Sequence, residues 1–414
     1  MGKCHNIYKF TKYKIRFLSP SFSFLPFPWE EGLGGEAGVL SIAKLHKLND
    51  FRNFFHYFFP LSTPNYELFL NFAPMKAIVD DKIPYIQGQI EQLVDEVCYL
   101  PGSQISAADV RDADILVVRT RTHCNRSLLQ GSQVRLIITA TIGYDHLDTT
   151  YLQEAGIRWT NCPGCNASSV CQYVHNALLA IGILPTSPAE PLVAGVVGVG
   201  HVGSRVAADL QAAGVNVLLC DPPRARKEKD FCHVPLEELA ERCDIITFHT
   251  PLNREGADAT YHLSDAAFFR SLRRQPVIIN SSRGEVIDNT ALVQALDNGR
   301  VRAAIIDTWE NEPHINSDLL ERAVIATPHI AGYSADGKVN ATRMSLQAIA
   351  EFLHKPFTLN IQPPTLPSNY QYGAVSEGPL RLYDPRVDTQ HLKADSTSFE
   401  QLRGNYPLRR EHQD

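Results

Sequence analysis

The sequence has no strong excess of either charge: its 414 residues carry a net charge of -6, with acidic and basic residues interleaved. It therefore lacks the basic stripe that indicates nucleic-acid binding and the polybasic anchor that indicates membrane binding. Hydrophobic residues make up 44% and charged residues 20%, which is ordinary for a globular protein with a large core. The composition favours two or three domains that act on small molecules.

A disulfide framework is also missing. The nine cysteines are an odd number without a repeating spacing, which indicates a reducing compartment and predicts a cytoplasmic protein. Cys162 and Cys165 form a C-x-x-C pair that a redox or zinc site could use, but no second such pair or histidine pair accompanies it. We expect a turn with two free thiols there, and no metal site.

The first 74 residues differ from the remainder. They hold twelve of the 19 phenylalanines, and no helical or alternating period is sustained in them. No uncharged run in this segment reaches the roughly 18 residues of a membrane span, and prolines interrupt the segment after its basic start. At Met75 a strand pattern begins, so we expect residues 1–74 to be an extension without a recognisable domain.

From Met75 onward, short runs rich in Val, Ile and Leu alternate with helical patterns, which is typical of parallel sheets covered by helices on both faces. The first group of strands is expected at 75–81, 113–122, 135–146 and 156–164. A connecting helix at 168–184 and a loop at 185–191 then lead to a second group of strands.

The second group opens with a G-x-G-x-x-G pattern between an apolar strand and an amphipathic helix. Gly198, Gly200 and Gly203 are its glycines, and His201 and Val202 begin the helix. Glycines at this spacing allow a tight turn, close approach to a pyrophosphate and close packing of helix on strand. We expect these five residues to bind a dinucleotide.

The next strand ends in Asp221. A carboxylate at this position can accept hydrogen bonds from both ribose hydroxyls of NAD and would repel the 2′-phosphate of NADP. A turn residue before Pro222 is the alternative interpretation. Arg224 and Arg226 lie close by and leave room for NADP.

The remaining strands of the second group end in polar residues, among them Arg283, Glu312 and His329. Ligands of doubly wound sheets bind at the carboxyl ends of the strands, so these side chains are expected to share one crevice. Arg283 can hold a substrate carboxylate. His329 can take a hydroxyl proton while a hydride leaves the adjacent carbon, and Glu312 can orient the imidazole. The pattern predicts a hydroxy-acid dehydrogenase.

At these residues the sequence resembles the D-isomer-specific 2-hydroxyacid dehydrogenases. The shared motifs, besides the glycine turn, are "SSRGEVID" at 281–288, "DTWENEP" at 307–313 and "TPHIAGYS" at 327–334. The similarity extends over residues 75–355. Further stretches, "TATIGYDHLD", "PGCNASSV", "LLCDPPRA" and "LYDPRVDT", are similar to a branch of that family that acts on a phosphorylated hydroxy acid.

The resemblance implies NAD as cofactor, a small phosphorylated hydroxy acid as substrate, and a homodimer. It implies that Arg283 and Glu312 are active-site residues and that His329 is the proton donor in the reducing direction. The residues implied to contact NAD are Asp221, Thr250, Asp307 and Gly332, and those implied to contact the substrate are Thr120, Thr141 and Tyr333.

Arg119 and Arg121 are our candidates for binding the substrate phosphate. They lie at the end of the strand expected at 113–122, and a dianion needs charged donors. Ordinary surface charge is the alternative for both arginines.

We expect an α/β fold in which a Rossmann-type doubly wound NAD domain (169–329) is inserted in a smaller flavodoxin-like substrate domain (75–168 and 330–355). Residues 356–414 would form a short C-terminal dimerisation domain. Two other functions stay open: a dehydrogenase for another acid, such as phosphoglycerate or glycerate, and a non-catalytic NADH-sensing binding protein.

Overall fold

The computed structural model describes residues 74–184 and 191–411. The predicted extension at 1–74 therefore lies outside the described residues, except for Pro74, and so does the predicted loop at 185–191, except for its last residue. No helix within the described ranges is long and apolar enough to cross a membrane.

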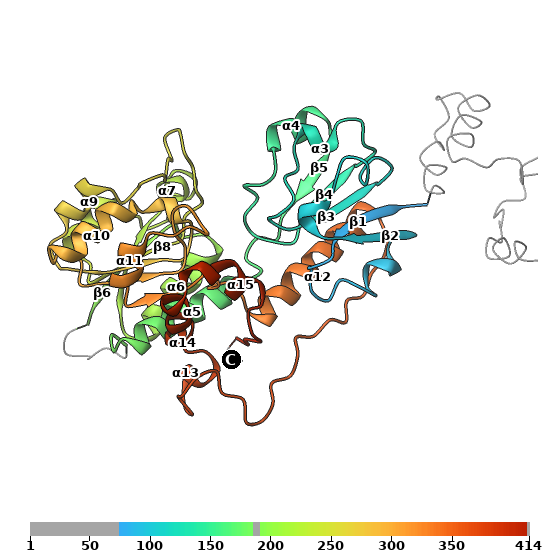
Figure 1. Cartoon of the computed structure of the whole chain (residues 1–414). Helices are drawn as coiled ribbons and strands as arrows, with labels where there is room; N and C mark the ends of the chain where they lie inside the picture. The colour runs from blue at the N-terminus through green and yellow to red at the C-terminus, as the bar shows by residue number, and fades with distance from the viewer. Residues whose placement is uncertain (1–73, 185–190, 412–414) are drawn as a thin grey trace, which may run out of the picture. The chain divides into compact units, whose positions relative to one another are not determined.

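The first sheet has five parallel strands, and Figure 1 shows them together (blue to green). They are β1 Lys76–Asp80, β2 Glu96–Leu100, β3 Ile115–Val118, β4 Leu136–Thr139 and β5 Arg158–Thr160. Their order, β2-β1-β3-β4-β5, is that of flavodoxin-like folds, which confirms the predicted class of this sheet. The short helices beside it are η2 Ile90–Gln92, η3 Gly102–Gln104, α3 Arg126–Leu129 and α4 Thr149–Glu154.

The sequence pattern does not reveal β2. This strand lies at the sheet edge, and its residues are exposed or half-buried. It therefore lacks the continuous apolar run that marks the interior strands β3 and β4, all of whose residues are buried.

Helix α12 (Ala335–Phe352) covers one face of the first sheet, although it follows the second sheet in the chain. Its buried Val339, Leu346 and Ile349 belong to the same core cluster as Val79 and Val117 of the strands. Figure 1 shows the helix (orange) beside these strands. An element that follows the second sheet in the chain therefore packs on the first sheet, and the predicted domain bounds stay a prediction.

The second sheet has six parallel strands in the order β11-β10-β9-β8-β6-β7. They are β6 Val193–Val197, β7 Asn216–Cys220, β8 Ile245–Phe248, β9 Val277–Asn280, β10 Ala303–Ile306 and β11 Ile325–Ala326. The chain runs outward from β6 to β7 and then in the other direction from β8 to β11. This reversal between β6 and β8 is the switch point at which a doubly wound sheet binds its ligand.

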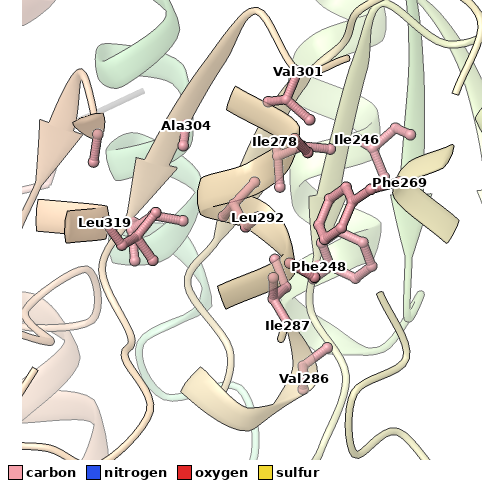
Figure 2. Close-up of a cluster of buried hydrophobic side chains, with 14 of the residues drawn as sticks. Ile246, Phe248, Phe269, Ile278, Val286, Ile287, Leu292, Val301, Ala304 and Leu319 are labelled. Atoms are coloured by element: carbon pink, nitrogen blue, oxygen red, sulfur yellow. The ribbon is translucent and has the colours of Figure 1, made fainter. Parts of the chain in front are cut away.

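Helices cover both faces of the second sheet. The connecting helix α5 (Ala167–Ala180), which ends four residues before the predicted position, and α6 (His201–Ala212) bury one face. The opposite face packs against α8 Leu236–Arg242, α9 Ala266–Ser271, α10 Asn289–Asp297 and α11 Ser317–Arg322. Figure 2 shows this second core, in which Ile246, Ile278 and Ala304 of the strands lie near Phe269, Leu292 and Leu319 of the helices.

The C-terminal segment packs on the second sheet. It forms α13 Pro379–Leu382, α14 Pro385–Ala394, η5 Ser396–Ser398 and α15 Phe399–Gly404. Tyr383, Leu392 and Phe399 are fully buried in the cores on the two faces. The Thr389 hydroxyl accepts a hydrogen bond from the Ala326 amide of β11 (3.1 Å). The last part of the chain is therefore anchored beside β11.

Candidate active site

The loop after β6 carries the three glycines of the predicted nucleotide-binding turn. Gly198 has a φ of +82°, and a Cβ there would come within 2.8 Å of the His249 backbone. A Cβ on Gly203 would collide with the Gly198 carbonyl, so α6 packs directly on the loop. A Cβ on Gly200 would meet no atom within 4 Å. Gly198 thus allows the sharp turn, Gly203 the close contact with the helix, and Gly200 the open space beside the loop. This arrangement fits a loop that binds a pyrophosphate.

The first turn of α6 faces this open space. It begins at His201, which is exposed, and Val202, which is half-buried. The N-cap residue Gly200 has no side chain that could accept a hydrogen bond from the first backbone N–H groups. Uncapped N–H groups at a helix N-terminus, together with the helix dipole, favour an anion at this point.

Asp221 follows β7, and its two carboxylate oxygens contact the backbone on two sides. Oδ2 accepts a hydrogen bond from the Val199 amide in the glycine loop (2.8 Å), and Oδ1 accepts one from the Arg224 amide (2.9 Å). Asp221 therefore caps the short helix α7 (Pro222–Lys227), as the turn interpretation expects, and also holds the glycine loop. Each oxygen keeps a lone pair that a ribose hydroxyl could use.

Two side chains below the glycine loop have buried polar atoms without a partner among residues 74–184 and 191–411. These atoms are Nδ1 of His249 and Oγ1 of Thr250, at the end of β8. Burial lowers the pKa of His249 to about 3, so its ring is neutral near pH 7. Unsatisfied polar groups are rare in protein interiors. Their position at the switch point between β6 and β8 fits a dinucleotide that would supply the missing hydrogen bonds.

His329 and Glu312 form a hydrogen-bonded pair, with His329 Nδ1 2.8 Å from Glu312 Oε2. Burial acts to raise the pKa of Glu312, but the charge and hydrogen bond of His329 and the amide of Trp309 (3.0 Å) hold it below its ordinary value. The carboxylate is therefore ionised and fixes the ring orientation. Within the described ranges the His329 ring forms its hydrogen bond through Nδ1, which leaves Nε2 available to accept a proton from a substrate.

The backbone at His329 is held in an unusual conformation, with a φ of +57°. Its amide donates to the Asp307 carbonyl (2.8 Å), and the Asp307 carboxylate accepts hydrogen bonds from the amides of Ile330 (2.8 Å) and Ala331 (3.0 Å). Burial raises the pKa of Asp307. These contacts make Asp307 the anchor of the histidine loop. The NAD contact predicted for Asp307 stays a prediction.

Gly332, the other predicted NAD contact in this loop, lies against Asn166 at the start of α5. A Cβ at Gly332 would collide with the Asn166 side-chain amide. The glycine is therefore required for close packing of the histidine loop on α5, and its contact with NAD is untested.

Arg283 connects the two sheets. It follows β9 in the chain, and its Nε and Nη2 donate to Oδ2 of Asp145, which follows β4, at 3.3 and 3.1 Å. Nη1 donates to the Ser282 carbonyl (2.7 Å). Asp145 is 64% exposed, whereas Arg283 is 29% exposed. Both nitrogens donate to the same oxygen of the exposed Asp145 carboxylate, so Arg283 can bind a carboxylate at this position, and its role as the substrate anchor stays a prediction.

The three predicted substrate contacts lie on separate loops. The Thr141 hydroxyl lies 2.7 Å from that of Thr139 and 2.9 Å from the Gly143 carbonyl oxygen. Thr120 is exposed just beyond the end of β3. Tyr333 lies between the histidine loop and α12 and is half-buried. No direct contact among Thr120, Thr141 and Tyr333 is present in the described part of the chain.

The two arginines considered for the phosphate differ in their partners. Nε of Arg119 lies 3.3 Å from Oδ2 of Asp80, which is 1% exposed. Arg121 instead pairs with Glu400 of the C-terminal helix α15. The charge of Arg121 is thus compensated by a residue far away in the sequence. The prediction that Arg121 binds the phosphate did not foresee this ion pair.

Arg403 is a site residue that the sequence interpretation missed. It belongs to α15, and its Nε donates to the Tyr333 hydroxyl (3.0 Å). Its Nη1 lies 4.0 Å from Oε2 of Glu312, and both side chains are 18% exposed. The C-terminal segment therefore places a cation beside the histidine–glutamate pair. In the sequence, Arg403 is the arginine of "FEQLRG", and no local pattern there indicates that it lies near the site.

Cys162 and Cys165 are buried and free. The thiol of Cys162 packs near the Ala341 carbonyl (3.3 Å) and the Ser345 hydroxyl (3.5 Å) of α12. Burial raises the pKa of Cys162 to about 11 and that of Cys165 to about 12, so both thiols are protonated near neutral pH. Among the residues with described positions, no group of three or more metal-ligating side chains is present.

Comparison with protein families gives a match to the NAD-binding domain of the D-isomer-specific 2-hydroxyacid dehydrogenases over residues 185–331. An erythronate-4-phosphate dehydrogenase of Bacteroides thetaiotaomicron is 54% identical over 339 residues, which cover 81% of this chain and 97% of the relative. One from Porphyromonas gingivalis is 44% identical over 346 residues, covering 81% of this chain and 94% of the relative.

Solved structures show the same fold. A glyoxylate reductase from Paecilomyes thermophila superposes with a TM-score of 0.59 at 22% identity, covering 69% of this chain and 97% of that one. An NAD-bound 3-phosphoglycerate dehydrogenase from Entamoeba histolytica gives a TM-score of 0.58 at 23% identity, covering 68% and 96%. At this identity the likeness concerns the fold alone.

Proposed function

The chain belongs to the D-isomer-specific 2-hydroxyacid dehydrogenases, among which it groups with the erythronate-4-phosphate dehydrogenases, and we propose that it oxidises 4-phospho-D-erythronate with NAD. The product is (R)-3-hydroxy-2-oxo-4-phosphooxybutanoate. The reaction is a step in the biosynthesis of pyridoxal 5′-phosphate. The identity to relatives of that name, over nearly their whole length, carries this assignment.

The chain's own residues supply the acid–base and binding parts of the reaction. Arg283 holds the substrate carboxylate in a two-pronged grip. His329 takes the hydroxyl proton on Nε2, because Nδ1 is engaged by Glu312 at 2.8 Å. Glu312 stabilises the imidazolium that forms. NAD, when bound, would supply the hydride acceptor, and Asp221, Thr250 and the glycine loop would hold it.

The observation that supports this proposal is that three groups follow different strands at one edge of the second sheet, and that two of them, His329 and Glu312, are hydrogen-bonded. Glu312 follows β10, His329 follows β11 and Arg283 follows β9, all at the carboxyl edge of the second sheet. A dehydrogenase for 2-hydroxy acids needs an anion anchor, a proton acceptor and a group that orients the acceptor.

The assembly and compartment are part of the same proposal. The substrate domain comprises residues 75–168 and 330–355, and the NAD domain comprises residues 169–329. The C-terminal domain, residues 356–414, supports a homodimer. The buried, free cysteines favour a reducing cytoplasm. Size-exclusion chromatography with light scattering measures the dimer, and a mass of one chain at working concentration would contradict it.

The test is NADH formation by the purified full chain with 4-phosphoerythronate, phosphoglycerate and glycerate. We expect 4-phosphoerythronate to have the largest kcat/KM. The variant Arg283→Lys removes the guanidinium that is proposed to bind the substrate carboxylate. We expect its turnover rate to fall sharply, because a lysine ammonium cannot donate two parallel hydrogen bonds to a carboxylate. A higher kcat/KM for another acid would reassign the substrate, and binding of NADH without turnover of any acid would favour the NADH-sensing function.

A further inference from the structure

The first turn of α12 places Lys338 next to the active site. Lys338 lies five positions after Tyr333, and its Nζ is 5.2 Å from the centre of the Tyr333 ring. The residue is half-buried. A lysine in the first turn of a helix is placed unfavourably with respect to the helix dipole, which favours negative charge there. Its presence requires a compensating interaction.

Residues 74–184 and 191–411 do not supply an anion for this ammonium group. Among the described residues no hydrogen bond or ion pair is formed by Nζ of Lys338, and its one close contact is the tyrosine ring. Its charged neighbour is another cation: burial and then the charge of Arg119 hold the pKa of Lys338 below its ordinary value. Asp80 compensates Arg119 at 3.3 Å, so the charge of Lys338 stays unbalanced.

The two cations approach the substrate region from separate elements. Arg119 directly follows the last residue of β3 and precedes Thr120, whereas Lys338 lies on α12 beside Tyr333. Thr120 and Tyr333 are the predicted substrate contacts on these elements. An anion between the two elements would therefore meet two positive charges and the groups expected to hold the substrate.

We propose that Lys338, together with Arg119, binds the phosphate group of the substrate. This inference rests on the proposed function, because it names the groups that recognise the phosphate of 4-phosphoerythronate. A phosphate dianion suits a lysine, which acts as a point charge with three donors, whereas the planar carboxylate suits the fork of Arg283. Arg121 is a weaker candidate because it is not among the charges that act on Lys338, whereas Arg119 is.

The phosphate also explains the cost of leaving Lys338 without a counter-charge. A cation partly removed from water and next to a second cation destabilises the free protein. Binding of a dianion removes this unfavourable interaction, so the site discriminates strongly between phosphorylated and unphosphorylated acids. Binding energy from the remote phosphate can then position the reacting carbon.

The experiment compares Lys338→Met with the wild type on two substrates, 4-phosphoerythronate and unphosphorylated erythronate. Methionine keeps the aliphatic stem and removes the charge. We expect kcat/KM for 4-phosphoerythronate to fall on the order of 10²-fold, the size of a lost buried charge contact, and kcat/KM for erythronate to change by less than about 3-fold. Lys338→Arg, which keeps the charge, should retain most of the preference.

Lys355→Met is the matched control. Lys355 follows the other end of α12 and donates to the Leu93 carbonyl (2.7 Å), far from the substrate loops. It should leave the preference for the phosphorylated acid unchanged. An equal loss of kcat/KM for both acids in Lys338→Met, or no loss for either, would overturn the inference. A wild type without preference for the phosphorylated acid would overturn the proposed substrate as well.

Discussion

Nδ1 of His329 lies 2.8 Å from Oε2 of Glu312, and among the described residues the ring forms its hydrogen bond through this nitrogen, which leaves Nε2 available. This arrangement settles which nitrogen is available to a substrate. The carboxylate engages one side of the imidazole and leaves the other for proton transfer. It is the arrangement of a general base with its orienting group, whatever acid is bound.

The first prediction concerns this pair. His329→Ala should lower the rate roughly 10²- to 10⁴-fold, the usual contribution of a general acid or base. Glu312→Gln should lower it less and move the pH profile of oxidation to lower pH, because the imidazolium loses its counter-charge. Oxidation and reduction should have opposite pH dependence, since one needs the neutral ring and the other the protonated ring.

The control for the pair is NAD affinity, measured by fluorescence titration. It should stay near the wild-type value in His329→Ala, because the ring is predicted to act on the substrate. Near-normal turnover with an unchanged pH profile in this variant would show that His329 only ends a strand.

The second prediction concerns Arg403, a positioning residue that acts through Tyr333 and Glu312. Arg403→Met removes the hydrogen bond to the Tyr333 hydroxyl (3.0 Å) and the charge near Glu312 (4.0 Å). Because Arg403 is one of the charges that lower the pKa of Glu312, that pKa should rise. We expect roughly a 10-fold loss of kcat with a displaced acid limb of the pH profile.

Arg381→Met is the matched control for Arg403, because Arg381 also lies in the C-terminal segment and donates to the Tyr370 carbonyl (3.0 Å). It should change thermal stability without moving the pH profile. If Arg403→Met did only the same, Arg403 would be a structural residue. Partial recovery in Arg403→Lys would support the electrostatic role.

The third prediction concerns cofactor choice. Asp221→Asn keeps the shape and one acceptor oxygen but removes the charge that would face a 2′-phosphate. The nearby arginines are engaged: Arg224 donates to the Val199 carbonyl (2.8 Å), and Arg226 pairs with Asp258 (2.5 Å). We expect the ratio of kcat/KM for NAD to that for NADP to fall roughly 10- to 100-fold.

Asp209→Asn serves as the control for cofactor choice. Asp209 lies on α6, and its carboxylate is paired with His175 (2.8 Å) instead of the glycine loop. Its cofactor ratio should match the wild type. A wild type that prefers NADP would mean that Arg224 or Arg226 outweighs Asp221.

The fourth prediction concerns pH and stability at Asp388 in α14. Burial raises its pKa from 3.8 to about 6, although the hydroxyls of Tyr372 (2.8 Å) and Tyr406 (3.0 Å) donate to it. Between these values the unfolded chain has lost the proton that the folded chain keeps, so folding stability falls as pH rises. The wild type should lose roughly 3 kcal/mol relative to Asp388→Asn across this window.

Urea denaturation at several pH values between about pH 4 and about pH 7 measures this difference. The two stability curves should converge toward the acid end and separate as pH rises. Parallel curves would mean that the carboxyl of Asp388 titrates alike in the folded and unfolded chains.

Local patterns in the sequence were enough to predict the fold class and the sheet edge at which Glu312 and His329 lie. Strands such as β3, β4, β8 and β9 are buried along their whole length, so they appear as continuous apolar runs that need no partner to be recognised. The glycine turn is local as well, because the spacing of its three glycines lies within one loop and the start of one helix. Parallel strands share one carboxyl edge, which brings Glu312 and His329 together without knowledge of side-chain positions.

The partners of these side chains could not be predicted from the sequence, because they come from distant parts of the chain. Arg283 meets Asp145 across 138 residues, Arg403 meets Tyr333 across 70, and Arg121 meets Glu400 across 279. The edge strand β2 was missed because its residues are exposed or half-buried, so it has no continuous buried run. Such contacts depend on how the second sheet, α12 and the C-terminal segment pack against elements formed earlier in the chain, and no local period or spacing records that packing. The same holds for Lys338, whose missing counter-charge becomes visible only once its surroundings are known.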